Sequence, residues 1–243
     1  MKIEKKPALD ISEIQIDNLA VRSTGMSLAQ LDSVIELALR SAIREGSTTV
    51  NDAILEEAFE TFNSGEVKKW DASQLERVAS HEAGHALMCW LSGQTPSYLP
   101  IVARGNHGGY MQHADQEGKA IYTKEELLDR IRTSLGGRAA EIVYYGQQEG
   151  ISTGAGGDLA NATRLAQQIV CTYGMDEEFG LAVVTGTMPD AVRTIVNRIL
   201  KEQLEKAVKL ILENRDKIDF LVEALMDKNH LNGAQIEQTL LKN

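Results

Sequence analysis

Two histidines and one glutamate form the stretch of the chain with the clearest capacity for chemistry. His81 and His85 lie four positions apart, and Glu82 directly follows the first of them. On a helix this spacing places both imidazoles on one face, with Cβ atoms roughly 5–6 Å apart, so both can turn a ring nitrogen toward one metal ion. Glu82 lies off that line, where it can reach a water on the metal. The spacing therefore indicates zinc-dependent hydrolysis of a peptide bond, with Glu82 as the proton acceptor.

A catalytic zinc ion takes three protein ligands and keeps one position for water, so the two histidines need a third ligand. The sequence offers five candidates for it: His107, His113, Glu141, Asp158 and His230. We favour Asp158, because it follows a glycine-rich loop that can bring its carboxylate to a buried ion. Glu141 is the second choice as a ligand, and it could instead accept a hydrogen bond from a ligand histidine.

Each of these residues also has a purely structural interpretation. His81 and His85 could be core residues of an amphipathic helix, and Asp158 could cap the helix that begins there. The other candidate histidines lie in hairpin or turn patterns, which favour exposure to solvent. The small residues beside the two histidines, Ala83, Gly84 and Ala86, favour a functional site, because they leave room at a metal and let a neighbouring helix approach closely.

Composition excludes some classes of partner and compartment. The chain of 243 residues has a formal net charge of −10, which argues against nucleic acid or an anionic membrane surface as a partner. Cys89 and Cys171 each lie in an apolar helical pattern, so we interpret both as core residues in a reducing compartment. No apolar run approaches the roughly 18 residues of a membrane span, and the first residues lack a signal peptide. These features predict a soluble chain.

The spacing of apolar residues predicts a mainly α (α+β) fold. Helices are expected at residues 11–21, 27–45, 51–62, 71–91, 123–145, 158–173 and, with a break near residue 214, from 190 onward. The helix that ends at residue 91 could begin at either Asp71 or Ser73. Two short strands, at 97–103 and 109–113, predict a β-hairpin near the site. Pro100 indicates an exposed or irregular edge for the first strand, which could pair with an extended substrate.

A pair of glycines interrupts one of these predicted helices. Gly136 and Gly137 lie inside the helix expected at 123–145, and each weakens a helix by about 1 kcal/mol relative to alanine. Such a loss is tolerable where another backbone must come close. We therefore expect a neighbouring helix to pack against this point.

Three motifs together resemble a known family. His-Glu-Ala-Gly-His-Ala at 81–86 resembles the zinc motif of the FtsH-type ATP-dependent metalloproteases. Ser-Thr-Gly-Ala at 152–155, leading to Asp158, resembles the segment that brings their third ligand, an aspartate. The sequence at 135–141 is similar to the family's Gly-Gly-Arg-x-Ala-Glu stretch. The resemblance covers most of the chain from about residue 68 onward.

This resemblance implies specific roles for the candidate residues. His81, His85 and Asp158 would bind Zn²⁺, Glu82 would be the general base, and the substrates would be unfolded or extended polypeptides. The family also implies a homo-oligomer, a hexameric ring. Residues 24–31 resemble, more loosely, the start of the small helical lid that follows the family's AAA ATPase core. We therefore expect a lid-like subdomain at 1–66 and a zinc metallopeptidase domain at 67–243.

The ATPase signature of the family is absent from this sequence. No Gly-x-x-x-x-Gly-Lys-Ser/Thr phosphate loop is present, so we expect that this chain alone does not bind ATP. The chain would be either a fragment of a longer protein or a protease half that acts without its motor. We predict a cytoplasmic location, or the cytoplasmic face of a membrane if the full protein is anchored.

The sequence thus predicts a zinc endopeptidase that acts through a water activated by Glu82. The alternative is a non-catalytic assembly or interaction domain that keeps the fold, with or without the metal. An intact Glu82 favours the enzyme.

Overall fold

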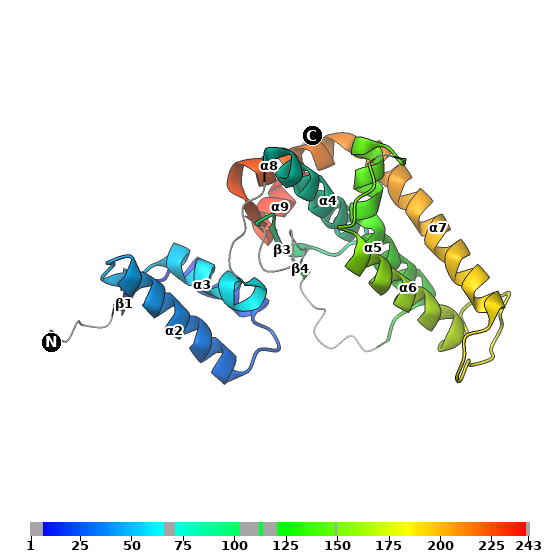
Figure 1. Ribbon diagram of the computed structural model, residues 1–243, viewed down its shortest axis with the longest axis horizontal. Helices are drawn as coiled ribbons and strands as arrows, with labels where there is room; N and C mark the ends of the chain where they lie inside the picture. Colours follow the sequence, from blue (N-terminus) through cyan, green and yellow to red (C-terminus); the bar gives the residue numbers. More distant parts are fainter. Residues whose placement is uncertain (1–6, 66–70, 103–111, 114–120, 149, 242–243) are drawn as a thin grey trace. The chain divides into compact units, whose positions relative to one another are not determined.

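The computed structural model of the chain describes residues 7–65, 71–102, 112–113, 121–148 and 150–241. Within these residues, helices dominate and the strands are short, which confirms the predicted mainly α fold. The described residues form two compact units: 7–65 with Val102, and the remainder. Figure 1 traces the elements of each unit. Among the described residues, every helix is too short or too polar to cross a membrane.

The first unit contains three helices and one parallel strand pair. Its elements are β1 (Ala8–Leu9), α1 (Glu13–Arg22), α2 (Leu28–Arg44), β2 (Thr49–Val50) and α3 (Asp52–Ser64). The Ser27 side chain caps α2 and Asn51 caps α3, each by accepting a backbone N–H of the first turn. These helices agree with the predicted ones. The β1–β2 pair was not predicted, since strands of two residues carry no alternating pattern.

A charged cluster is buried inside the first unit. The Arg22 guanidinium at the end of α1 donates to Glu56 Oε1 at 2.7 Å and also to Glu60, both on α3. It also lies over the Phe59 ring, 4.8 Å from the ring centroid. A cation therefore lies between two carboxylates in the core of this unit.

The second unit contains the remaining helices and a small antiparallel sheet. Its elements are α4 (Ala72–Leu91), β3 (Pro96–Pro100), β4 (Gln112–His113), α5 (Lys124–Tyr145), α6 (Gly156–Cys171), α7 (Asp190–Glu213), α8 (Arg215–Lys228), β5 (His230–Asn232) and α9 (Gly233–Leu240). Helix α5 contacts α4, α6 and α7, and α4 also contacts α8 (Figure 1). Helix α5 is thus the central helix of this unit.

Local sequence explains where most of these helices begin. Asp71 and Gln74 form a capping box at α4, and Thr123 and Glu126 form one at α5. Of the two predicted starts for α4, the structure therefore uses Asp71 and not Ser73. Helix α6 begins at Gly156 after Ala155, without a side-chain cap.

The sheet has the strand order β4-β3-β5. The predicted hairpin is confirmed as the antiparallel pair β3–β4; the segment 103–111 that joins the two strands lies outside the described residues. An exposed or irregular edge was expected for this strand. The edge toward β5 is not exposed, because Pro100 pairs with His230, but the pairing with β4 is irregular between Pro96 and Tyr98. Proline lacks a donor, but the next residue, Ile101, donates to the Asn229 carbonyl at 2.9 Å and continues the pairing. Strand β5 thus occupies one edge of β3 at Tyr98–Pro100, and the described residues of β4 pair with the other edge at Pro96 and Tyr98.

Two apolar cores lie along α5. Its first half carries Leu127, Ile131 and Leu135 into a core shared with α6 and α7. Ala139 and Ala140 belong to another core, shared with α4, α8 and α9. The glycine pair lies between these two groups.

The expected close approach of a second backbone at the glycine pair is confirmed. A Cβ added to Gly136 would lie 2.5 Å from the Gly84 carbonyl oxygen. A Cβ added to Gly84 would in turn lie 2.8 Å from the carbonyl carbon of Gly136 and from Ala140 Cβ. Helices α4 and α5 therefore cross with their backbones in contact at this point, and only glycine fits on either side.

Both cysteines are free thiols. Cys89 is buried in α4, and this burial raises the pKa of its thiol to about 12, which makes it unreactive at neutral pH. Cys171 is half-buried at the end of α6 and packs against the core there. The interpretation as core residues is confirmed for Cys89, whereas Cys171 lies at the margin of its core.

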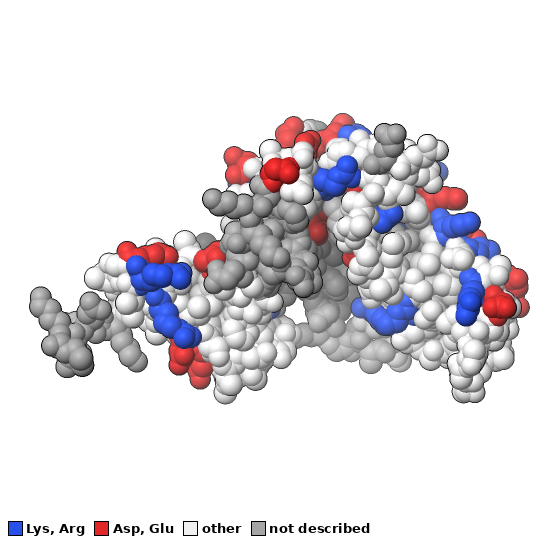
Figure 2. All heavy atoms as spheres, viewed as in Figure 1, with Lys and Arg blue, Asp and Glu red and all other residues white. Residues whose placement is uncertain are grey.

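Charges of both signs are mixed on the face shown in Figure 2. On the face shown in Figure 2, Lys and Arg of the described residues lie in small groups among Asp and Glu, without an extended basic patch. The formal net charge of −10 is therefore not accompanied by a basic surface on this face.

Candidate metal centre

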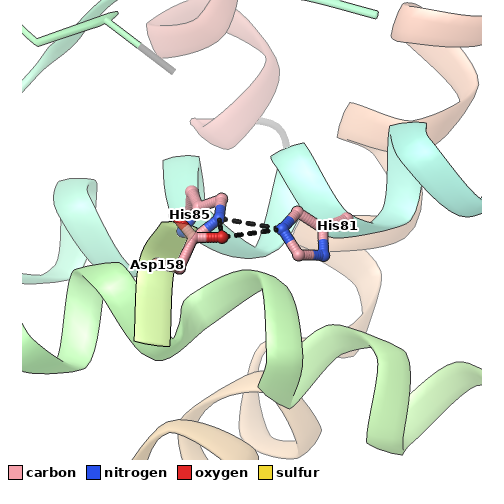
Figure 3. A group of neighbouring side chains, drawn as sticks. All are labelled: His81, His85 and Asp158. Atoms are coloured by element: carbon pink, nitrogen blue, oxygen red, sulfur yellow. Dashed lines mark hydrogen bonds and ion pairs between the residues drawn. The ribbon is translucent and has the colours of Figure 1, made fainter. Parts of the chain in front are cut away.

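Three side chains from two helices converge at the start of α6. His81 and His85 lie one turn apart on α4 and are 7% and 6% exposed. Asp158 lies in the first turn of α6, and its carboxylate points at both imidazoles (Figure 3). The candidate ligand favoured from the sequence is thus the one that the structure brings to the histidine pair.

The atoms that meet are His81 Nε2, His85 Nε2 and Asp158 Oδ2. Asp158 Oδ2 lies 3.2 Å from His81 Nε2 and 3.3 Å from His85 Nε2. The two Nε2 atoms are 3.1 Å apart. Within the described part of the chain, no other group of three potential metal ligands comes together.

The other nitrogen of each imidazole has its own partner. His85 Nδ1 lies 2.7 Å from the Thr133 carbonyl oxygen, which can only accept, so His85 carries a proton on Nδ1. His81 Nδ1 lies 3.0 Å from Glu141 Oε1, and a carboxylate likewise accepts. In the neutral imidazoles, these bonds leave the Nε2 lone pairs directed at the point of convergence.

This donor set fits a zinc ion. Two imidazole nitrogens and one carboxylate oxygen are typical of catalytic zinc sites. In a tetrahedral site with metal–ligand bonds of about 2.0–2.1 Å, neighbouring ligand atoms lie roughly 3.3–3.4 Å apart. The three separations of 3.1–3.3 Å in this chain are close to those values. Without a cation or a proton, three electron-rich atoms at these distances would repel one another.

Glu141 connects the histidine to the loop that precedes α6. Its Oε2 accepts the Ser152 backbone N–H at 2.9 Å, and its Oε1 accepts the Ser152 hydroxyl at 2.5 Å. Arg138, on the same helix, donates to the Ser152 carbonyl at 3.0 Å. Burial disfavours the Glu141 charge, but the bonds from His81 and Ser152 outweigh it and lower its pKa to about 2. The same carboxylate thus orients His81 and holds the chain segment that leads to Asp158.

The electrostatics of the three converging groups favour positive charge among them. Burial opposes protonation of His81, but hydrogen bonds to Asp158 and Glu141 outweigh it and raise the His81 pKa to about 10. Burial opposes ionisation of Asp158, but both histidines outweigh it and hold its pKa well below the usual range. In the absence of a metal, these shifts favour a protonated His81 beside an ionised Asp158.

Glu82 differs from the other acids of the site because one of its carboxylate oxygens is buried without a hydrogen-bond partner among the described residues. It is 5% exposed, and its Oε2 has no hydrogen-bond partner among the described residues. Burial raises the Glu82 pKa, although the neighbouring imidazoles oppose this shift. A buried carboxylate oxygen with no protein partner is unusual, and it lies next in sequence to a candidate metal ligand.

The other candidate ligands that the structure describes, Glu141 and His230, do not join the converging atoms. His107 is outside the described residues, and only the backbone of His113 is described, in β4. His230 is exposed on β5, with its ring 5.7 Å from that of Tyr98. Glu141 contacts His81 at Nδ1, not at the converging Nε2.

The alternative interpretation of Asp158 as a helix cap is wrong. Helix α6 begins at Gly156, so Asp158 is its third residue, and Ala155 occupies the cap position. The Asp158 side chain contacts the two imidazoles instead.

Three contacts of the site were not predicted from the sequence. Thr133 contributes a backbone carbonyl, which has no signature in the sequence. Ser152 was noted only as part of a family motif, and its bonds to Glu141 depend on the fold of the loop. The backbone of Gly137 lies against the His81 ring. The glycine pair signalled close packing there, but not against a side chain.

Comparison with known proteins gives consistent matches. Residues 68–188 match Peptidase family M41. The ATP-dependent zinc metalloprotease FtsH 3 of Sphaerobacter thermophilus is 34% identical over 239 residues, covering 94% of this chain and 48% of that protein. The ATP-dependent zinc metalloprotease FtsH of Mycoplasma genitalium is 36% identical over 250 residues, covering 95% of this chain and 34% of that protein. The chain thus spans about a third to a half of the length of these curated relatives.

Proposed function

We propose that this chain, which belongs to peptidase family M41, is a zinc-dependent endopeptidase that hydrolyses peptide bonds of unfolded or extended polypeptides. The family membership agrees with the resemblance expected from the three sequence motifs. The observation that carries the proposal is the convergence of two imidazole nitrogens and one carboxylate oxygen beside the buried Glu82.

His81, His85 and Asp158 would hold the zinc ion. Zinc, when bound there, supplies a Lewis acid that polarises the substrate carbonyl and makes a water more acidic. The bonds of the two Nδ1 atoms fix each ring, so the ring nitrogens need not reorganise when the metal binds. Asp158 supplies the negative charge that partly neutralises the ion.

Glu82 would be the general base. Its Oε2 accepts a proton from the attacking water and then delivers that proton to the amine nitrogen of the leaving peptide. Burial keeps the Glu82 carboxylate away from solvent, so the proton stays within the site between the two transfers. A proton transfer of this kind contributes about 10²- to 10⁴-fold to the rate.

The organisation of the whole protein is also a proposal. The name of the relatives, "ATP-dependent zinc metalloprotease", suggests that hydrolysis in this chain is linked to an ATPase. We propose that residues 1–66 correspond to the helical lid of that ATPase and 67–243 to the peptidase domain. Assembly into a homo-oligomeric ring and a location in the cytoplasm, or on the cytoplasmic face of a membrane, are further predictions from the family.

The proposed activity is tested by the substitution Glu82→Gln in the zinc-loaded chain. We expect the variant to bind about one zinc per chain, as the wild type does, and to lose at least about 100-fold of its casein cleavage. Glu76→Gln is the matched control, because Glu76 is exposed on the same helix; this variant should cleave casein as the wild type does. Undiminished cleavage by Glu82→Gln would exclude Glu82 as the base. A zinc-loaded wild type that cleaves no unfolded protein would instead support the non-catalytic assembly domain.

A further inference from the structure

The two adjacent glycines of α5 face different neighbours. The three nearest atoms to a Cβ added at Gly136 belong to backbone: the Gly84 carbonyl oxygen, its carbon and the Cα of His85. The three nearest atoms to a Cβ added at Gly137 all belong to the His81 imidazole: Nε2, Cδ2 and Cε1. Both sets of contacts are closer than real Cβ atoms tolerate, so something must move if either glycine is replaced.

The neighbour that must move decides the effect of each replacement. At Gly136 it is the backbone of α4, which cannot shift without separating α4 from α5. At Gly137 it is an imidazole on a rotatable side chain, so the ring can turn away while the helices stay together. The ring edge in question includes Nε2, the atom that faces Asp158 at 3.2 Å.

We propose that Gly137 is a positioning residue for metal binding: the absence of its side chain creates the slot in which the His81 imidazole lies. The inference rests on the proposed function, because His81 is assigned there as a zinc ligand. Gly137 and Glu141 lie one turn apart on α5, so both are on the face toward His81. Glu141 holds the ring at Nδ1, and Gly137 limits where the opposite edge can lie. Gly136 has a separate role, in helix packing.

The first test compares Gly137→Ala with Gly136→Ala in the full chain. Gly137→Ala should weaken zinc binding by about 10-fold or more, with a changed visible absorption spectrum of the cobalt-loaded chain and a metal-free Tm close to that of the wild type. Gly136→Ala should mainly lower the metal-free Tm. Gly156→Ala is the control, because a Cβ there meets nothing within 4 Å; it should change neither zinc affinity nor Tm by much.

A double variant separates a conflict with the ring from a general packing defect. In a His81→Ala background the slot is no longer filled, so Gly137→Ala no longer conflicts with a ring. The added substitution should then raise the metal-free Tm, because alanine favours the helix more than glycine does. The inference is overturned if Gly137→Ala binds zinc with wild-type affinity and gives the wild-type cobalt spectrum. It is also overturned if Gly137→Ala lowers the metal-free Tm equally with and without His81. A wild-type chain that binds no zinc would overturn the proposed function itself, whatever the glycine variants do.

Discussion

The two units of this chain both bury charged groups, but they do so in opposite ways. In the first unit, the Arg22 guanidinium lies between Glu56 and Glu60, so the protein supplies its own cation. In the second unit, the carboxylates of Asp158 and Glu82 lie with two imidazoles, which are neutral unless they take up a proton or bind a metal.

This difference separates a structural cluster from a binding site. A buried carboxylate beside a fixed guanidinium is satisfied within the fold. A buried carboxylate beside two imidazoles requires a positive charge from outside, as a proton or as a metal ion. Substitutions in the first cluster should therefore change stability alone, whereas those in the second should change metal affinity first.

The largest expected effect is on the stability of the first unit. Arg22→Met removes the guanidinium from the buried Glu60 and the half-buried Glu56 and should destabilise this unit by about 3–5 kcal/mol. Hydrogen exchange of the α2 and α3 amides in the zinc-loaded chain would measure this loss. The control is Arg40→Met, since Arg40 and its partner Glu36 are both exposed; it should change stability by about 0.5 kcal/mol or less. The account of a purely structural cluster is wrong if Arg22→Met also lowers the zinc content.

A smaller effect is expected for the third ligand, and it should fall on metal binding. Loss of a residue that only hydrogen-bonds to a metal ligand lowers metal affinity by about 10- to 100-fold. Asp158→Ala removes a proposed ligand itself, so zinc affinity should fall by more than this. Competition with a chelator of known affinity would measure the change. Asp190→Ala removes a fully exposed carboxylate from the start of α7, and this control should leave the affinity unchanged.

Glu141→Gln should have a smaller effect than Asp158→Ala. The amide keeps the shape of the side chain but loses the charge that holds His81 at Nδ1, so zinc affinity should fall by about 10- to 100-fold, equivalent to about 1.4–2.7 kcal/mol. The same titration measures it, with Glu125→Gln, at an exposed position of α5, as the control. A greater loss for Glu141→Gln than for Asp158→Ala would exchange the roles of the two carboxylates.

The smallest effect concerns a second self-contained ion pair, located in the second unit. Burial disfavours the Asp176 charge, but backbone N–H groups of Phe179 and Glu178 and the Arg198 guanidinium, at 2.9 Å, outweigh it and lower the Asp176 pKa from its usual 3.8. A carboxyl whose pKa is lower in the folded than in the unfolded chain stabilises the fold at pH values above its unfolded-state pKa. This contribution is lost as the pH falls from the unfolded-state pKa through the folded-state pKa.

Asp176→Asn should therefore destabilise the metal-free chain at pH 6, and this difference should shrink as the pH falls below 3.8. The difference should be about 1 kcal/mol or less, because the Arg198 side chain is 42% exposed. Urea unfolding at a series of pH values would measure it. A difference that grows toward low pH would contradict the assignment, as would a loss of zinc affinity.

Sequence was sufficient to predict the features of this chain that are local. Ser27, Asn51 and Thr123 begin their helices as expected, because capping depends on residues within one turn. The apolar spacing gave the positions of the long helices. The hairpin of β3 and β4 was predicted, but the pairing of β5 with β3 could not be, since β5 follows β3 by more than a hundred residues and contains only three.

The candidate site likewise combines local features, which the sequence predicted, with features that depend on how distant segments pack, which it did not. The spacing of His81 and His85 on one helix is a local property, and it predicted their common direction. Asp158 was favoured from its glycine-rich loop, but the sequence alone could not separate a ligand from a helix cap, because both interpretations place an aspartate at a helix start. The slot at Gly137 depends on how two helices cross, which the sequence only indicated as close packing.

X-ray absorption at the zinc K-edge of the loaded chain tests the central claim most directly, because it identifies the ligand atoms themselves. We expect two imidazoles at about 2.0–2.1 Å and oxygen ligands at about 2.0–2.2 Å, with no sulfur. In Asp158→Ala the two imidazoles should remain while the oxygen shell changes. A sulfur neighbour at about 2.3 Å, or a spectrum with fewer than two imidazoles, would contradict the assignment of His81, His85 and Asp158 as the zinc site.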